Sequence, residues 1–255
     1  MIWVLSGTKD GVEIIRLLKK EGFKVFASAA TEYGAALSKK AGADYAIAKV
    51  LDCKGMADFI KKNKISAVVD ATHPFAIEAN KNAMKACKSA KVKYLRYERK
   101  AAKIPGSSLI WYAKNFKEAG EKAAQLGNVI FYTAGSKNLD KFLKAVKGKK
   151  IIARVLPDVK AIQKCLNLGL KPSEVIAGEG PFSEAFNKAM LREYKADVLV
   201  TKESGTAGGV EAKVNAALAL NIPAVVVERP KIEYSAVVSK YTDVVKRLRR
   251  EGIKK

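Results

Sequence analysis

His73 is the single histidine of this 255-residue chain, and it bounds the chemistry that the side chains can perform. It follows an apolar run in Asp70-Ala71-Thr72-His73-Pro74, where proline suits the first turn of a helix. A histidine there either caps the helix or exchanges a proton with a ligand. We expect the second role, because His73 stands in a short polar cluster at a strand end. One imidazole excludes a multi-histidine metal centre, and a hydrolase triad would have to use His73.

A second candidate site lies near the N-terminus, where Gly7, Thr8, Lys9 and Asp10 open a helix directly after an apolar run. Small residues let the backbone approach a ligand, and the first N–H groups of a helix can bind a phosphate. The glycine spacing is G-x-x-x-G rather than the G-x-G-x-x-G fingerprint of dinucleotide-binding proteins, so a plain tight turn is the alternative.

The loop after the second expected strand runs from Ser28 to Thr31 and contains no acid. An acid at this place usually binds the 2′-hydroxyl of a ribose, so its absence leaves room for a 2′-phosphate. This loop therefore favours NADPH over NADH.

Further cationic residues follow other expected strands. Arg96 and Arg99 flank Glu98, and two arginines around an acid either bind a carboxylate or phosphate or form a surface ion-pair network. In the second half of the chain, Arg154 ends one strand. The loop 201–209 carries three glycines and leads to Lys213. Connections in α/β units usually have about 2–6 residues, so this longer loop indicates a ligand site, with a flexible connector as the alternative.

The elements that position these loops alternate between strands and helices. Ten short runs rich in valine, isoleucine and aromatic residues are expected strands: 2–6, 24–28, 44–47, 67–70, 93–96, 129–133, 151–155, 174–177, 197–201 and 224–227. The segments between most of them carry apolar residues at helical spacing. This pattern predicts an α/β fold of parallel sheets covered on both faces. Loops at the carboxyl ends of such strands are where ligands bind.

Ten strands are too many for one comfortable sheet, and the polar stretch 103–108 interrupts the pattern. We therefore expect two doubly wound Rossmann-like domains, 1–103 and 104–255, with a TIM barrel as the competing assembly. The second domain is expected to end in a helix over 236–250, and the basic residues of 246–255 in a solvated tail.

Charge and cysteine content restrict the setting. The 48 Lys and Arg residues exceed the 25 Asp and Glu residues by 23. This excess indicates, in decreasing order, solvated lysine-rich faces, a polyanionic substrate, or nucleic acid, for which no motif is present. Cys53, Cys87 and Cys165 are widely spaced, which indicates free thiols in a reducing compartment. With no signal peptide and no apolar run of about 18–20 residues, we expect a cytoplasmic protein without a membrane partner.

Five segments together resemble the precorrin-6A reductases of cobalamin biosynthesis: DATHPFA (70–76), R-x-E-R (96–99), GPFS (180–183), TKESGTAGG (201–209) and IPAVVVERP (222–230). The resemblance covers residues 1–230 in the family's order. It implies two Rossmann-like domains with an active-site cleft between them. It also implies reduction of one double bond of precorrin-6A or its cobalt complex, giving the 6B form, by NADPH or NADH. One departure is the first turn, SGTKDG, where GGT followed by an acid is commoner.

The resemblance also implies roles for individual residues. The proton would come from His73, from Lys202 or from water. The cofactor would contact Gly7, Thr8, Lys9, Asp10, Ser28, Thr31 and Thr72. The polycarboxylated tetrapyrrole would contact Arg96, Arg99, Ser136, Arg154, Phe182, Ser204, Gly205 and Lys213. We expect no protein-bound metal. Two functions remain as alternatives: a carrier of a nucleotide or corrinoid without chemistry, and, less favoured, a nucleic-acid-binding module.

Overall fold

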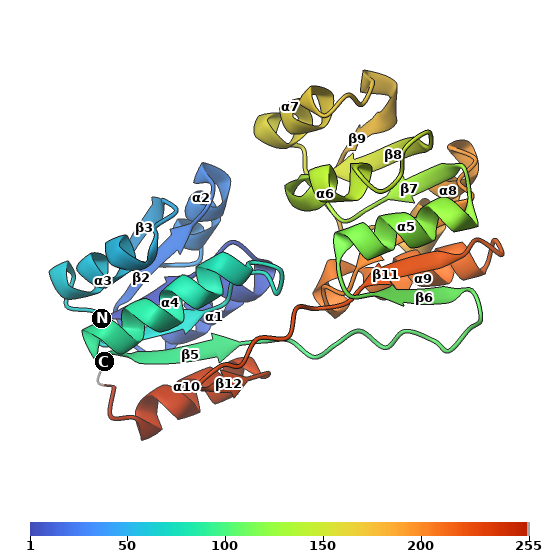
Figure 1. Ribbon diagram of the computed structural model, residues 1–255. Coiled ribbons are helices and arrows are strands. Elements are labelled where there is room, and N and C mark those ends of the chain that lie inside the picture. The colour runs from blue at the N-terminus through green and yellow to red at the C-terminus, as the bar shows by residue number, and fades with distance from the viewer. Residues whose placement is uncertain (254–255) are drawn as a thin grey trace. The chain divides into compact units, whose positions relative to one another are not determined.

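The computed structural model describes residues 1–253 and divides into two compact units (Figure 1). Unit 1 consists of Met1–Lys100 together with the described residues from Pro230 onward, and unit 2 is Ala101–Arg229. Each unit has one six-stranded parallel sheet with helices between the strands, so the expected α/β fold of two Rossmann-like sheets is confirmed. Two separate open sheets exclude the TIM barrel. None of the helices within residues 1–253 combines the length and apolar character that crossing a bilayer requires.

The sheet of unit 1 has the strand order β12-β5-β4-β1-β2-β3. Its strands are β1 (Ile2–Leu5), β2 (Val25–Ala29), β3 (Tyr45–Ala48), β4 (Ala67–Asp70), β5 (Lys93–Tyr97) and β12 (Val237–Val238). This is the usual Rossmann order 3-2-1-4-5-6, with β12 in the sixth place. From β1 the strands continue toward one edge of the sheet, and from β4 they continue toward the other edge. The space between β1 and β4 is therefore the topological switch point, where ligands usually bind in this fold. Leu5 pairs with Asp70, so the loops after β1 and β4 begin side by side.

Five helices accompany this sheet: α1 (Lys9–Lys20), α2 (Glu32–Lys40), α3 (Cys53–Lys62), α4 (Ile77–Ala90) and α10 (Tyr241–Arg250). The first three begin where the sequence supplies a side-chain cap. The oxygens of Thr8, Thr31 and Asp52 each accept a hydrogen bond from the N–H three residues further on. These caps fix the start of each helix directly after the strand-end loop that precedes it.

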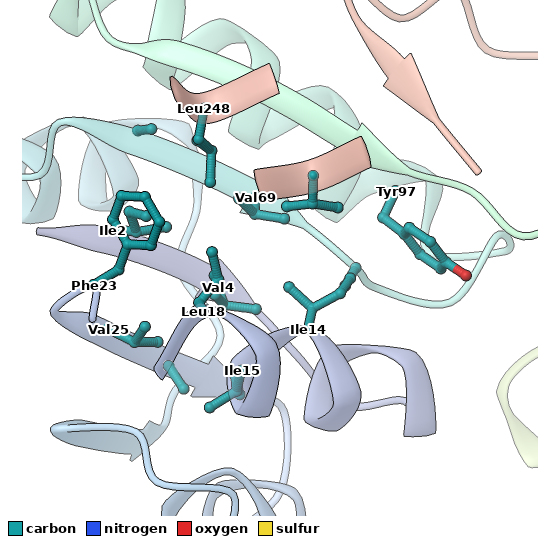
Figure 2. Close-up of a cluster of buried hydrophobic side chains, with 14 of the residues drawn as sticks. Ile2, Val4, Ile14, Ile15, Leu18, Phe23, Val25, Val69, Tyr97 and Leu248 are labelled. Carbon is teal, nitrogen blue, oxygen red and sulfur yellow. The ribbon is translucent and has the colours of Figure 1, made fainter. Parts of the chain in front are cut away.

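One face of the unit 1 sheet is covered by a buried apolar cluster (Figure 2). Ile14 and Leu18 lie one turn apart on α1 and share this cluster with Val4 of β1. Helix α10 adds Val244 and Leu248, both buried. Burial of one such side chain contributes about 1.5–3 kcal/mol, so α10 is an integral part of unit 1.

The C-terminal segment therefore packs on the first unit, which differs from the expected domain 104–255. The N–H of Arg96 in β5 donates to the carbonyl of Ala236 at 2.9 Å, and β12 continues the sheet beyond β5. The helix expected over 236–250 begins only at Tyr241, because the residues before it form this strand. The physical reason is that β5 would otherwise be an open edge. The last two residues of the expected solvated tail lie outside the described residues.

The sheet of unit 2 has the order β6-β11-β10-β7-β8-β9, again a 3-2-1-4-5-6 arrangement when it is counted from β7. Its strands are β6 (Ile110–Ala113), β7 (Val129–Tyr132), β8 (Lys150–Val155), β9 (Val175–Ala177), β10 (Val198–Lys202) and β11 (Ala224–Val227). Its helices are α5 (Phe116–Leu126), α6 (Leu139–Leu143), α7 (Val159–Asn167), α8 (Glu184–Glu193) and α9 (Val210–Leu218). The switch point lies between β7 and β10. The sixth strand, β6, comes from the segment that sequence patterns left without structure.

Candidate active site

The loops after β1 and β4 meet at the switch point of unit 1. Gly7 is exposed and has a φ of +109°, and a Cβ at this position would meet no heavy atom within 4 Å. A Cβ at Gly11 would lie 2.6 Å from the Oγ of Ser6, so glycine there lets α1 pack closely on the strand. An open backbone turn followed by a close-packed helix start is the arrangement that accommodates a dinucleotide pyrophosphate, which the residues present therefore fit.

Thr8 joins the two loops. Its Oγ1 accepts a hydrogen bond from Gly11 N at 3.2 Å and donates one to the carbonyl of Ala71 at 2.9 Å. The hydroxyl that caps α1 thus also fixes the backbone just before His73. Lys9 and Thr31 are exposed at the same end of the sheet, and Thr31 caps α2.

Asp70 is the centre of a buried hydrogen-bond network that shapes the second loop. Its carboxylate is fully buried. One oxygen accepts from Asn80 Nδ2 and from the Tyr94 hydroxyl, both at 2.7 Å. The other accepts from Thr72 N at 3.0 Å, from Thr72 Oγ1 at 2.7 Å and from Arg96 Nη1 at 3.0 Å. Burial and the nearby Asp70 raise the pKa of Tyr94, which keeps its hydroxyl a donor.

The network changes the roles expected for Thr72 and Arg96. The Thr72 hydroxyl donates to Asp70 and accepts from Asn80 at 2.9 Å and from Arg96 at 3.3 Å, so its hydrogen-bonding capacity is used internally. Arg96 is 0% exposed and forms ion pairs with Asp70 at 3.0 Å and with Glu98 at 3.7 Å. We therefore withdraw the Thr72 hydroxyl and Arg96 as ligand contacts. Both instead hold the loop that carries His73.

His73 is partly buried, and its Nδ1 accepts a hydrogen bond from the N–H of Phe75 at 3.2 Å. A neutral ring in this arrangement carries its proton on Nε2, so the ring can donate from that atom. The histidine thus caps the following turn through Nδ1, and Nε2 is the ring atom that carries the proton. The two roles that the sequence presented as alternatives are compatible.

Three other expected contacts in unit 1 are engaged inside the protein. Ser28 is buried, and its hydroxyl accepts from the indole N–H of Trp3 at 2.9 Å. Asp10 is buried and pairs with Arg99 at 2.8 Å. We withdraw Ser28 as a cofactor contact, because its side chain belongs to the core. Asp10 and Arg99 form an internal pair rather than two separate ligand contacts.

In unit 2, the corresponding strand ends carry buried positive charge. Arg154, at the end of β8, is 6% exposed, and Lys213, in the first turn of α9, is 8% exposed. Nη1 of Arg154 donates to Asn187 Oδ1 at 2.9 Å, and its guanidinium lies 4.7 Å from the centre of the Phe182 ring. Nζ of Lys213 is 3.4 Å from Thr201 Oγ1. Both of these hydrogen-bond partners, an amide and a hydroxyl, are neutral.

Burial and neighbouring cations lower the pKa values of two lysines in unit 2, Lys213 and Lys202. Burial and then the nearby charges of Arg154 and Lys202 lower the pKa of Lys213 to about 7. Burial and then Lys137 lower the pKa of Lys202 to about 8. Glu203, the neighbour of Lys202 in the chain, is paired with Arg229. We call Arg154, Lys202 and Lys213 the cation cluster, and an anionic ligand would balance the charges of Arg154 and Lys213.

The remaining expected residues of unit 2 surround the same strand ends. Ser136 begins the 3-10 turn after β7 (Ser136–Asn138) and is partly exposed. Ser204 is buried, and the N–H of Gly205 donates to Glu203 at 2.8 Å, so this loop is held by its own acid. Phe182 lies 5.1 Å from Phe186, ring centre to ring centre, and gives the cation cluster an aromatic neighbour.

Sequence reasoning missed the residues that support these loops. Asp70 and Glu203 stand in the DATHPFA and TKESGTAGG segments but received no role, while Asn80, Tyr94 and Asn187 carried no signal at all. Asn80, Tyr94 and Asn187 each act through a hydrogen bond to a residue at least 10 positions away in the sequence, and Glu203 pairs with the distant Arg229.

Comparison with known proteins identifies the family of this chain. Residues 1–249 match the family model described as "Precorrin-6x reductase CbiJ/CobK". The chain is 40% identical over 248 residues to the cobalt-precorrin-6A reductase of Methanothermobacter thermautotrophicus, covering 95% of this chain and 81% of that protein. It is 40% identical over 244 residues to the enzyme of the same name from Methanocaldococcus jannaschii, covering 95% and 96%.

The chain belongs to the precorrin-6x reductase family. The resemblance of the five segments is thereby confirmed, and with it the class, an oxidoreductase of the cobalamin pathway. A solved structure described as "CobK precorrin-6A reductase" has the same fold, with a TM-score of 0.79, 23% identity and coverage of 99% of this chain and 98% of that one. In this member of the reductase family, the two switch points and the cation cluster are the candidate ligand sites.

Proposed function

We propose that this chain reduces one double bond of cobalt-precorrin-6A with NADPH or NADH. The observation that carries the proposal is the cation cluster. Arg154 near the end of β8 and Lys213 in the first turn of α9 are buried with neutral hydrogen-bond partners, and a tetrapyrrole with several carboxylate arms would supply the balancing negative charge. The relatives at 40% identity are named for the cobalt form, which supports that substrate over the metal-free one.

The dinucleotide is assigned to unit 1. The open turn at Gly7 and the first N–H groups of α1 are suited to a pyrophosphate, and exposed Lys9 adds positive charge there. Thr31, the N-cap residue of α2, would contact the part of the dinucleotide that lies beyond the end of β2. The bound nicotinamide supplies the hydride. The protein's part is to hold the two reactants and to provide hydrogen bonds and a proton.

The carboxylate arms are assigned to unit 2. Arg154, Lys202 and Lys213 would bind them as charge partners, Ser136 would donate a hydrogen bond, and Phe182 offers an apolar surface to the flat ring. The proton is assigned to Lys202 or to Nε2 of His73. The pKa of about 8 for Lys202 suits release of a proton near neutral pH. Three free cysteines support the assignment to a reducing compartment such as the cytoplasm.

The decisive experiment mixes the purified protein with NADPH or NADH, with and without cobalt-precorrin-6A, and records the nicotinamide absorbance. Oxidation of the dinucleotide only when the tetrapyrrole is present is the expected result. No oxidation with either the cobalt form or the metal-free form would overturn the proposal. Lys202→Met and His73→Gln distinguish an enzyme from a carrier, because an enzyme should give at least one variant that binds normally and turns over more slowly.

The affinity for the tetrapyrrole is expected to fall as pH rises above neutrality. Lys213 and Lys202, with pKa values lowered to about 7 and about 8, attract carboxylates only in their protonated forms. Loss of these protons between about pH 7 and pH 9 weakens binding by roughly 10- to 100-fold, since each group contributes only while charged. Measuring KM across this range tests it. Lys213→Arg should flatten the profile, and an affinity that increases with pH would contradict the assignment.

A further inference from the structure

Asp10 occupies a position from which its negative charge should weaken dinucleotide binding at the proposed site. It is the second residue of α1, and its side chain is 5% exposed. A carboxylate in the first turn favours the helix itself, because it compensates the positive end of the helix dipole. The same negative charge, left without a partner, would repel the phosphates that the helix start is proposed to bind. Something in the fold has to compensate this charge.

Two groups from distant parts of the chain hold the carboxylate. The hydroxyl of Tyr241 donates to Oδ1 at 2.7 Å, and Nη2 of Arg99 lies 2.8 Å from Oδ2. Arg99 follows β5, and Tyr241 is the first residue of α10. Both oxygens of Asp10 are therefore bound by groups of unit 1 that lie outside its first helix.

Tyr241 is itself fixed in direction. Its ring stacks on Tyr97, with centroids 5.0 Å apart and an angle of 25° between the planes. Figure 2 shows Tyr97 at the edge of the apolar cluster with its hydroxyl pointing away from it. The buried residues of α10, Leu248 among them, anchor the helix that carries Tyr241. The donor is thus preorganised rather than mobile.

We propose that Tyr241 and Arg99 are positioning residues for dinucleotide binding: they hold and compensate the Asp10 carboxylate, so that the start of α1 accepts a phosphate. This inference rests on the proposed function, which places the dinucleotide at α1. It assigns to the C-terminal helix a part in the cofactor site although Tyr241 need not touch the cofactor. It also gives Arg99 a different task from the substrate contact expected from the sequence.

Substitutions of Arg99 and of Tyr241 should weaken NADPH binding to different extents. Arg99→Met leaves Asp10 with the Tyr241 hydrogen bond but without the Arg99 charge, and is expected to weaken NADPH binding about 10- to 100-fold, because two like charges then face each other at partly buried sites. Tyr241→Phe removes one neutral donor and is expected to weaken it about 3- to 10-fold. Dissociation constants are measured by nicotinamide fluorescence without any tetrapyrrole.

A double variant separates charge compensation from simple loss of structure. Arg99→Met combined with Asp10→Asn removes both charges, and its affinity for NADPH is expected to return to within about threefold of wild type, because the repulsion is gone. A merely structural role predicts that the double variant, which lost more native groups, binds no better than Arg99→Met. That result in a folded protein would overturn the inference.

The same pair of helices supplies a matched control. Arg249 of α10 forms an ion pair with Glu21, the C-cap residue of α1, at the opposite end of the helix from Asp10. Arg249→Met breaks a contact between the same elements and should change the dissociation constant less than about twofold, as is usual for exposed ion pairs. Equal effects of Arg99→Met and Arg249→Met would contradict the inference.

Further outcomes distinguish failure of the cofactor assignment from failure of the inference about Tyr241 and Arg99. If Arg99→Met does not fold, as judged by circular dichroism, Tyr241→Phe carries the comparison with Arg249→Met. If wild-type protein binds neither NADPH nor NADH, the assignment of the cofactor to α1 fails, and the inference fails with it. If the wild type binds and all variants bind equally, only the inference is overturned.

Discussion

Replacing Lys213 by methionine is expected to weaken tetrapyrrole binding and, at the same time, to stabilise the ligand-free protein. Lys213 is 8% exposed, and burial and two neighbouring cations lower its pKa to about 7. Methionine keeps most of the apolar stem and removes the charge. Losing one of the buried cations that are proposed to pair with the carboxylate arms should raise KM about 30-fold or more, as for other buried charge partners.

The gain in stability has a defined pH dependence. The folded-state pKa of Lys213 is below the ordinary value of 10.5, so the unfolded chain binds more protons between about pH 7 and pH 10.5. The cost of the charge in the folded state is therefore fully present below pH 7 and disappears toward pH 10.5. Lys213→Met should raise Tm most at pH 7 or below, and the difference from wild type should shrink as pH rises.

Thermal melts at several pH values, together with KM from steady-state kinetics, check both effects. Lys117 on α5, whose side chain is 77% exposed, is a suitable control. Lys117→Met should change neither Tm nor KM measurably, because an exposed charge is screened by solvent. A Lys213→Met protein that is less stable than wild type at pH 7, or that retains the wild-type KM, would show that Lys213 is not a strained ligand-binding cation.

Replacing Asp70 by asparagine should give the largest loss of stability, about 3–5 kcal/mol, because it leaves Arg96 as a buried charge without its main partner. Asp70 accepts hydrogen bonds from five donors on Thr72, Asn80, Tyr94 and Arg96, and an amide of the same size cannot accept them all. Chemical denaturation of the variant and of the wild type measures the difference.

A second acid, just before strand β3, gives the comparison. Asp44 pairs with Lys19 at 2.7 Å, but both side chains are about one-third exposed (33% and 28%). Asp44→Asn should cost about 1 kcal/mol or less, since solvent screens this pair. Arg96→Met in the Asp70→Asn background should recover part of the loss, because it removes the buried charge that has lost Asp70. Equal losses for Asp70→Asn and Asp44→Asn would contradict the view of Asp70 as the buried centre of its network.

Much of the fold could be predicted from the sequence because the central strands are apolar and lie between helical patterns. All ten expected strands are present, with ends displaced by no more than one residue. The two strands that were missed, β6 and β12, both occupy the sixth position of a sheet. Trp111 and Tyr112 of β6 are exposed, and β12 has two residues, so neither shows the buried run that marks a parallel strand.

The site could be predicted at the level of loops, and less well at the level of atoms. Arg154 and Lys213 were expected as substrate contacts, and the structure places them together in the cation cluster, where that role stays a proposal. Arg96 and Thr72 lie in the expected loop but point into the Asp70 network. Their direction depends on Asn80 and Tyr94, and spacing along one sequence does not show which side chains meet across strands.

The placement of the last strand has a consequence for how the chain is made. During synthesis the ribosome releases the first five strands of unit 1, then the whole of unit 2, and only afterwards β12 and α10. Until β12 and α10 have been synthesised, β5 is an unpaired edge, and the apolar residues that Val244 and Leu248 will cover are exposed to water. Unit 2 can therefore fold before unit 1 is complete, although most of unit 1 is synthesised first.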